Sequence, residues 1–157
     1  MLGAEARWAR STTLTGFGAT HMGRIGMDSP GSSRSLQAIA PGALEAFREP
    51  GQVHLSPLLF RQFFNLGIGE LERSLGAPFW LLRREPDDPV VQLRLLAFLR
   101  VHSALIDLGK DPITAAFHLR HTPIPAFRHQ TLFEVVRDGG VANALDYLDS
   151  ISSGFVG

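Results

Sequence analysis

Three histidines close to the C-terminal end have side chains that could bind a metal ion: His118, His121 and His129. His118 and His121 are three positions apart, so a helix would place both imidazoles on one face. A zinc site needs three or four ligands, and no Asp, Glu or Cys nearby in the sequence completes such a set. We therefore predict no metal site and interpret these imidazoles as surface or partner-facing side chains.

Patterns that support catalysis are weak throughout the chain. Residues 67–69 read Gly-Ile-Gly, but they lack the third glycine and the preceding strand of a dinucleotide-binding motif. Serine and aspartate are present, yet no spacing among them indicates an activated nucleophile. The acidic segment 85–89 is typical of a turn followed by a helix cap. We therefore predict that the protein is not an enzyme and needs no cofactor.

The composition restricts the class of protein further. The chain has 157 residues, which suffice for one domain or two very small ones. Its 15 basic and 15 acidic side chains give a formal net charge of zero, whereas proteins that bind nucleic acid by neutralising phosphates usually carry a basic excess. The lack of cysteine excludes disulfides and fits a reducing cytoplasm. No apolar run approaches the roughly 18–20 residues of a membrane span.

The elements that position these side chains are predicted to be helices. Residues 1–33 are rich in Gly, Ser, Thr and Arg, which predicts a disordered tail with Met22 and Met27 as alternative translation starts. Beyond them, apolar spacing, capping residues before prolines and glycine stops delimit each helix. The predicted helices are 34–47 with a break or kink at Pro41-Gly42, 57–66 closed by Gly67, 68–75, 79–84, 89–108, 112–120, 132–138 and 141–153. No segment alternates like a strand, so the predicted fold class is all-α.

Two of these helices have the outline of a helix-turn-helix. The short helices 68–75 and 79–84 are joined by a Gly-Ala-Pro turn, although any helical hairpin produces this pattern. The longest predicted helix, 89–108, is apolar nearly all round. It is therefore predicted to lie in the centre of the domain or to pack against a second copy.

Arginines that could contact DNA phosphates lie in this short pair. Arg83 and Arg84 end the second helix, and Arg73 lies in the first. Base reading needs polar side chains on the exposed face, whereas residues 79–82 are apolar and the acidic segment 85–88 would repel phosphates. Two interpretations stay open: the arginines contact the DNA backbone, or they are solvated or paired with the neighbouring carboxylates.

The C-terminal segment looks like a binding surface. Pro123 and Pro125 remove two backbone donors, so an extended chain is predicted over 121–127. The tail residues Phe155 and Val156 are apolar and are needed by no helix, so a partner pocket could recover their burial, at about 1.5–3 kcal/mol for a large side chain. A simpler interpretation competes, in which this segment is only the last helix pair of a helical domain.

Several positions of this segment match a known family in order and spacing. They are Thr122-Pro123-Ile124-Pro125-Ala126-Phe127, Thr131, Val135-Val136 before Gly139-Gly140, Tyr147-Leu148, and Gly154 to Gly157. The segment 117–157 resembles the toxin-binding domain of MbcA/ParS/Xre-type antitoxins. The resemblance extends more weakly through 66–111, where family members carry a helix-turn-helix unit.

This resemblance implies an antitoxin that sterically blocks a RES-type toxin, an enzyme that consumes cellular NAD. It implies a helix-turn-helix region over 34–109 and a small helical toxin-binding domain over 110–157. The implied toxin contacts are Pro123, Pro125, Phe127, Arg128, Gly154, Phe155, Val156 and Gly157. The resemblance also implies a homodimer that represses its own operon, with operator DNA contacted by Arg73, Arg83 and Arg84. The alternative is a stand-alone helix-turn-helix transcriptional regulator without a toxin partner.

Overall fold

The described part of the protein is a bundle of helices with one very small sheet. The computed structural model describes residue 39 and residues 41–154, so the predicted tail 1–33, most of the predicted helix before Pro41 and the terminal residues Phe155, Val156 and Gly157 lie outside the described residues. The helices are α2 (Pro41–Glu45), α3 (Pro57–Phe63), α4 (Ile68–Leu75), α5 (Phe79–Arg84), α6 (Pro89–Asp107), α7 (Pro112–His121), α8 (Leu132–Arg137) and α9 (Val141–Ser152). The predicted all-α class is confirmed.

Three helices begin where a capping side chain precedes a proline. At α6, Asp88 Oδ1 accepts from the Val90 and Val91 amides at 2.9 and 3.1 Å. The hydroxyl of Ser56 caps α3, and the carboxylate of Asp111 caps α7 in the same way. Proline fits the first turn of a helix because its missing N–H would have no intrahelical partner there. The predicted starts of these helices are therefore confirmed.

The predicted end of α3 at Gly67 is wrong. The helix ends at Phe63, and Asn65 takes a left-handed backbone with φ 51°. Gly67 is instead the N-cap of α4, where its amide donates to Glu70 Oε2 at 3.1 Å. The turn between α4 and α5 does use a glycine as predicted, because Gly76 has φ 68°, a region that glycine occupies at low cost.

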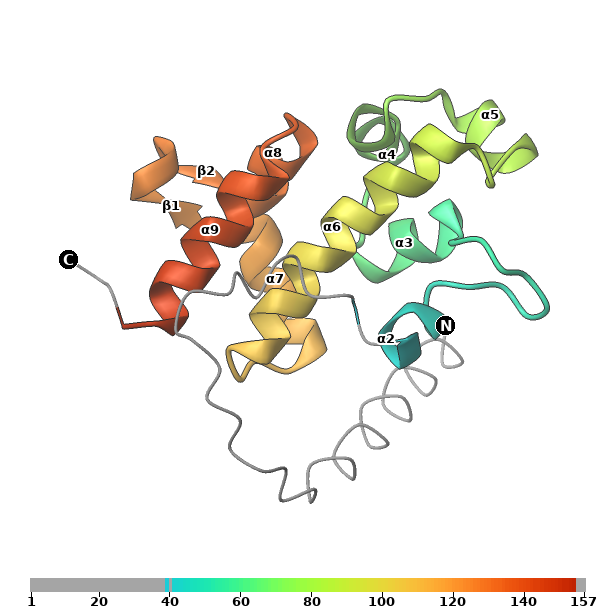
Figure 1. The fold of residues 1–157 in the computed structure, drawn as a ribbon. Helices are drawn as coiled ribbons and strands as arrows, with labels where there is room; N and C mark the ends of the chain where they lie inside the picture. Colours follow the sequence, from blue (N-terminus) through green and yellow to red (C-terminus); the bar gives the residue numbers. More distant parts are fainter. Residues whose placement is uncertain (1–38, 40, 155–157) are drawn as a thin grey trace, which may run out of the picture.

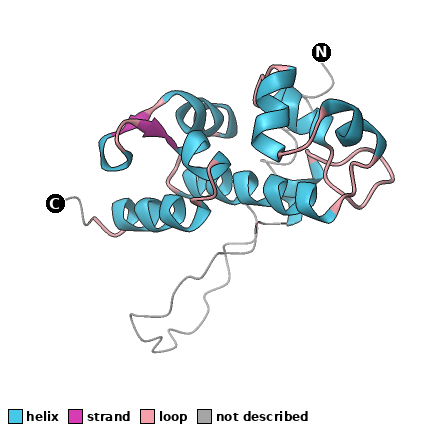
Figure 2. Cartoon of the chain, turned by 90° about the horizontal axis from the view of Figure 1, so that it is seen from above, coloured by secondary structure: helices cyan, strands magenta, loops and turns pink. Residues whose placement is uncertain are grey.

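The two prolines predicted an extended chain over 121–127, but the segment after α7 is extended only in part. Helix α7 runs to His121, strand β1 (Pro123–Ile124) pairs antiparallel with β2 (Gln130–Thr131), and the 3-10 turn η2 (Pro125–Phe127) lies between them. The two strands are the magenta segment of Figure 2, next to the C-terminal helices. Two residues per strand are too few to produce an alternating pattern, so the sequence carried no signal for this hairpin.

Helix α6 is the centre of the core. It crosses the molecule diagonally, with α3, α4 and α5 near its first half and α7, α8 and α9 along its second half (Figure 1). Phe98 of α6 packs against Phe60 of α3 and Phe133 of α8, with ring centroids 5.4 and 4.6 Å apart. One cluster of buried apolar side chains therefore spans both predicted regions, 34–109 and 110–157. The division between these regions stays a prediction about function.

The length and hydropathy of α6 alone would suffice to cross a membrane. Its buried side chains nevertheless face other helices of this chain, and the core helix of a folded domain has the same composition. Its second half also buries His102, whose Nε2 lies 2.9 Å from the carbonyl oxygen of Pro112. Burial lowers the pKa of His102 to about 4, although the bond to this carbonyl acts in the opposite direction.

Candidate binding surface

Strand β1 and the turn that follows it hold four of the eight predicted toxin-contact residues. Pro123 and Pro125 are exposed, while Ile124 between them is buried and anchors the strand in the core. Two backbone bonds close the turn, from the Arg128 amide to the Pro125 carbonyl at 3.1 Å and from the His129 amide to the Ile124 carbonyl at 3.0 Å. The turn is thus preformed, because both prolines and both bonds restrict its backbone.

Phe127 and Arg128, two further predicted toxin contacts in this turn, differ in how exposed their side chains are. Phe127 is half-buried, and its ring lies 5.3 Å from the ring of Tyr147 on α9. Phe127 therefore fastens the turn to α9 and offers only part of its surface outward. Arg128 is exposed, in the left-handed region at φ 55°, and its guanidinium bonds to no side chain in the described part of the chain.

The last predicted contacts lie at the end of α9. Gly154 is exposed with φ 74°, which suits a residue that ends a helix. Phe155, Val156 and Gly157 lie outside the described residues. Helix α9 and the turn stand side by side, since Tyr147 touches Phe127 and Figure 1 shows both at the same end of the molecule. The structure thus brings the turn next to the helix that leads into the tail.

An exposed apolar edge on α7 was missed by the sequence analysis. Ile113 and Phe117 are 64% and 61% exposed, and the ring of His121 lies 4.9 Å from that of Phe117. The spacing i, i+4, i+8 could have revealed this edge, because these positions share one face of a helix. The edge leads directly through Thr122 into Pro123. We call Ile113, Phe117 and His121, with the β1–β2 turn, the α7 edge surface.

The other two histidines considered as metal ligands, His118 and His129, lie apart from any metal-ligand cluster among the described residues. His118 Nδ1 lies 2.8 Å from the hydroxyl of Thr122, so this imidazole takes part in ending α7. His129 is exposed in the turn with φ 66°. Within the described residues, no three side chains of His, Cys, Asp or Glu come together as metal ligands would.

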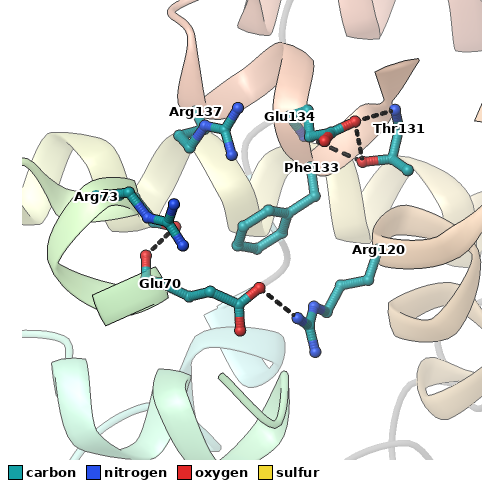
Figure 3. Close-up of a pocket in the computed structure, with 8 residues that line it drawn as sticks. Glu70, Arg73, Arg120, Thr131, Phe133, Glu134 and Arg137 are labelled. Atoms are coloured by element: carbon teal, nitrogen blue, oxygen red, sulfur yellow. Dashed lines mark hydrogen bonds and ion pairs between the residues drawn. The ribbon is translucent and has the colours of Figure 1, made fainter. Parts of the chain in front are cut away.

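The predicted DNA contacts do not form one patch. Arg83 and Arg84 are exposed at the end of α5 and make no ion pair with the carboxylates that follow them. Trp80 on the same helix is 64% exposed. Arg73 instead lines a small cavity between α4, α7 and α8, where Arg120 and Arg137 also lie (Figure 3).

Arg120 organises this cavity. Its Nη2 donates to Glu70 Oε1 at 2.8 Å, and its Nη1 donates to the carbonyls of Phe64 and Asn65 at 2.8 and 3.0 Å. Burial raises the pKa of Glu70, but the bond from the Gly67 amide and the charge of Arg120 outweigh it, so this pKa lies below its ordinary value. Glu70 is therefore a carboxylate at neutral pH. No sequence pattern indicates these contacts, because they join residues far apart in the chain.

Comparison of the chain with protein-family models, with curated proteins and with solved structures finds no match. Function is therefore inferred from the residues and contacts of this chain. The resemblance of the C-terminal segment to an antitoxin domain stays a prediction.

Proposed function

We propose that this protein is an antitoxin that binds a RES-type, NAD-consuming toxin in the cytoplasm and blocks it sterically. The α7 edge surface supports this proposal most directly. Two large apolar side chains, Ile113 and Phe117, are exposed beside a preformed turn with exposed prolines. Exposed aromatic residues beside a rigid backbone are typical anchors of protein interfaces. They lie in the segment that resembles the toxin-binding domain.

The chemistry of the chain agrees with steric inhibition. Within the described residues, the cavity with the arginines is only about 90 Å³, far smaller than the roughly 300–1,000 Å³ of sites that hold a substrate or cofactor. An inhibitor that covers the active-site entrance of an enzyme needs neither a catalytic group nor a cofactor. It needs a rigid surface of suitable shape.

Co-expression tests the proposal. Where a RES-type toxin gene lies beside the gene of this protein, the toxin is produced in bacteria together with wild-type protein or with a variant, and growth and cellular NAD are measured. We expect wild-type protein to restore both. Phe117→Ser is expected to lose this protection because it removes the exposed aromatic anchor.

Trp80→Ser is the matched control, because Trp80 is exposed to the same degree as Phe117 but lies on α5, away from the α7 edge surface. It is expected to protect fully. Protection that is lost with Trp80→Ser and kept with Phe117→Ser would place the interface on α5. A stably produced wild-type protein that neither protects nor binds the toxin would refute the antitoxin function.

Point variants are preferable to removing the C-terminal segment. Ala115, Leu119 and Ala144 of that segment are fully buried in the common core. Deleting them would expose the apolar face of α6, so the remaining chain would lose binding through misfolding. Exposed side chains can be changed with little effect on stability, about 0.5 kcal/mol or less.

The second candidate is a DNA-binding regulator, either as a role of the antitoxin or without a toxin. The helix pair α4–α5 with its left-handed Gly76 and the two unpaired arginines at the end of α5 favour it. Binding of the wild-type protein to a duplex from its own promoter should weaken steeply with salt. Arg83→Gln combined with Arg84→Gln should abolish binding, and unchanged binding would exclude this site.

The proposed antitoxin is also a homodimer. Val90 and Leu93 of α6 are 60% and 68% exposed and supply an apolar surface near the first half of the central helix. Sedimentation equilibrium of the wild-type protein should give twice the monomer mass, and Leu93→Glu should give the monomer mass. A wild-type monomer at micromolar concentration would refute the dimer without affecting the inhibition of a toxin.

A further inference from the structure

The cavity between α4, α7 and α8 holds more positive than negative charge. Figure 3 shows Glu70, Arg73, Arg120, Phe133, Glu134 and Arg137 around it, and its volume is about 90 Å³. Three arginines meet two glutamates there. Which donors remain free is decided by the hydrogen bonds of each side chain.

Both glutamates are already used by protein donors. Glu70 accepts from Arg120 through Oε1 and from the Gly67 amide through Oε2, at 2.8 and 3.1 Å. Glu134 Oε2 accepts from the amide and the hydroxyl of Thr131, at 2.9 and 3.3 Å, in the capping box of α8. Neither carboxylate bonds to Arg73 or Arg137, although the charge of Arg73 also contributes to the lowered pKa of Glu70.

Two of the three arginines have free donors. Arg120 is committed to Glu70 and to two backbone carbonyls. Arg73 donates only from Nε, to the Gly69 carbonyl at 3.2 Å, and Arg137 donates only from Nε, to Asp138 at 3.1 Å. The Nη groups of Arg73 and Arg137 therefore bond to no described residue.

The positions of these two guanidinium groups suit one shared ligand. In Figure 3 both lie on the same side of the Phe133 ring, Arg73 from α4 and Arg137 from α8. Each guanidinium has one carboxylate neighbour, Glu70 for Arg73 and Asp138 for Arg137, but the Nη donors of both stay available to an anion in the cavity. A tetrahedral oxyanion can accept from two guanidinium groups that approach from different walls, because its oxygens point in different directions.

We propose that Arg73 and Arg137 bind a phosphate group in this cavity. Its size admits the phosphate but leaves a nucleoside outside. The group is either free inorganic phosphate or the terminal phosphate of a nucleotide, and both present the same oxyanion to the two arginines. This site goes beyond toxin inhibition and does not depend on it.

Calorimetric titration of the full-length protein with inorganic phosphate, at constant ionic strength maintained with chloride, tests the site. We expect saturable binding. Arg73→Gln and Arg137→Gln should each weaken it about ten- to a hundredfold, since each removes charge-assisted hydrogen bonds. Arg84→Gln removes an exposed arginine that does not line the cavity and should leave the affinity unchanged.

Titration with AMP distinguishes the two sources of the phosphate. Affinity for AMP equal to or below that for phosphate means that the free ion is the ligand, and tighter binding of AMP means that a nucleotide is the ligand. No saturable binding of either compound would overturn the proposal, as would equal losses in Arg84→Gln and Arg73→Gln. Melting curves without phosphate establish that each variant is folded.

Discussion

Arg120 and Glu70 are 50 positions apart in the sequence, yet Nη2 of the arginine donates to Oε1 of the glutamate at 2.8 Å. The same guanidinium reaches the carbonyls of Phe64 and Asn65 and lies 5.8 Å from the ring centroid of Phe133. One side chain of α7 thus joins the α3–α4 connection to α8. This contact links the segment that resembles a toxin-binding domain to the helices before it.

Arg120→Met should destabilise the protein. The methionine keeps the apolar stem but leaves two carbonyls and a partly buried carboxylate without their donor, which is expected to lower the free energy of unfolding by about 2–3 kcal/mol. Urea denaturation measures the change. Arg100→Met on the exposed face of α6 is the control, with an expected change within about 0.5 kcal/mol. Equal effects of the two variants would show that the Arg120 contacts contribute little.

His102 should make stability depend on pH. Its pKa is about 4 in the folded protein and ordinarily 6.5, so the unfolded chain binds the proton more readily between these values. Stability from this residue is therefore complete above pH 6.5 and falls as the pH decreases toward 4, by at most about 1.4 kcal/mol per pH unit. The free energy of unfolding at several pH values should fall less steeply for His102→Leu than for the wild type. Identical slopes would contradict the lowered pKa.

Thr131 should stabilise both β2 and the start of α8. Its hydroxyl accepts from the Glu134 amide at 3.2 Å, and the Glu134 carboxylate accepts from the Thr131 amide at 2.9 Å. Thr131→Ala is expected to cost about 1 kcal/mol, while Thr131→Ser keeps the capping oxygen and should cost clearly less. Thermal denaturation ranks the two variants. If serine is as destabilising as alanine, the capping bond is not the reason.

Two glycines should respond to alanine in opposite directions. A Cβ on Gly140 would lie 2.9 Å from Cγ1 of Val135 and 3.1 Å from its carbonyl oxygen, so Gly140→Ala should destabilise the α8–α9 junction by about 1–3 kcal/mol. A Cβ on Gly69 meets nothing within 4 Å inside α4, so Gly69→Ala should stabilise the protein by about 0.5–1 kcal/mol. Denaturation midpoints of both variants check the signs. A stabilising Gly140→Ala would contradict the close approach.

Helix positions were predictable where local chemistry sets them. The Gly-Ala-Pro turn at 76–78 delimits α4 and α5 at the predicted residues, and a capping residue before proline marks the first turns of α6 and α7. These signals act within a few residues of the helix end. The error at Gly67 has a local cause as well, because glycine suits an N-cap and a helix stop equally.

The candidate sites were less predictable, because distant contacts decide them. The sequence indicated that Phe127 belongs to the turn but not that Tyr147 of α9 covers one side of its ring. The shared helix pair predicts that Arg73 acts with Arg83 and Arg84, whereas the structure places it beside Arg120 and Arg137. Only tertiary packing determines which way an arginine on an amphipathic helix points.

Helix α6 contributes buried side chains to both ends of the molecule. Gene fusions that take residues up to Leu108 from one parent and the remainder from another would therefore join mismatched halves of a single core. Such chimeras should fold poorly unless α6 and the helices α7 to α9 come from the same parent protein. If Ile113 and Phe117 carry the proposed binding, its specificity would change by substitutions at these exposed positions rather than by shuffling of segments.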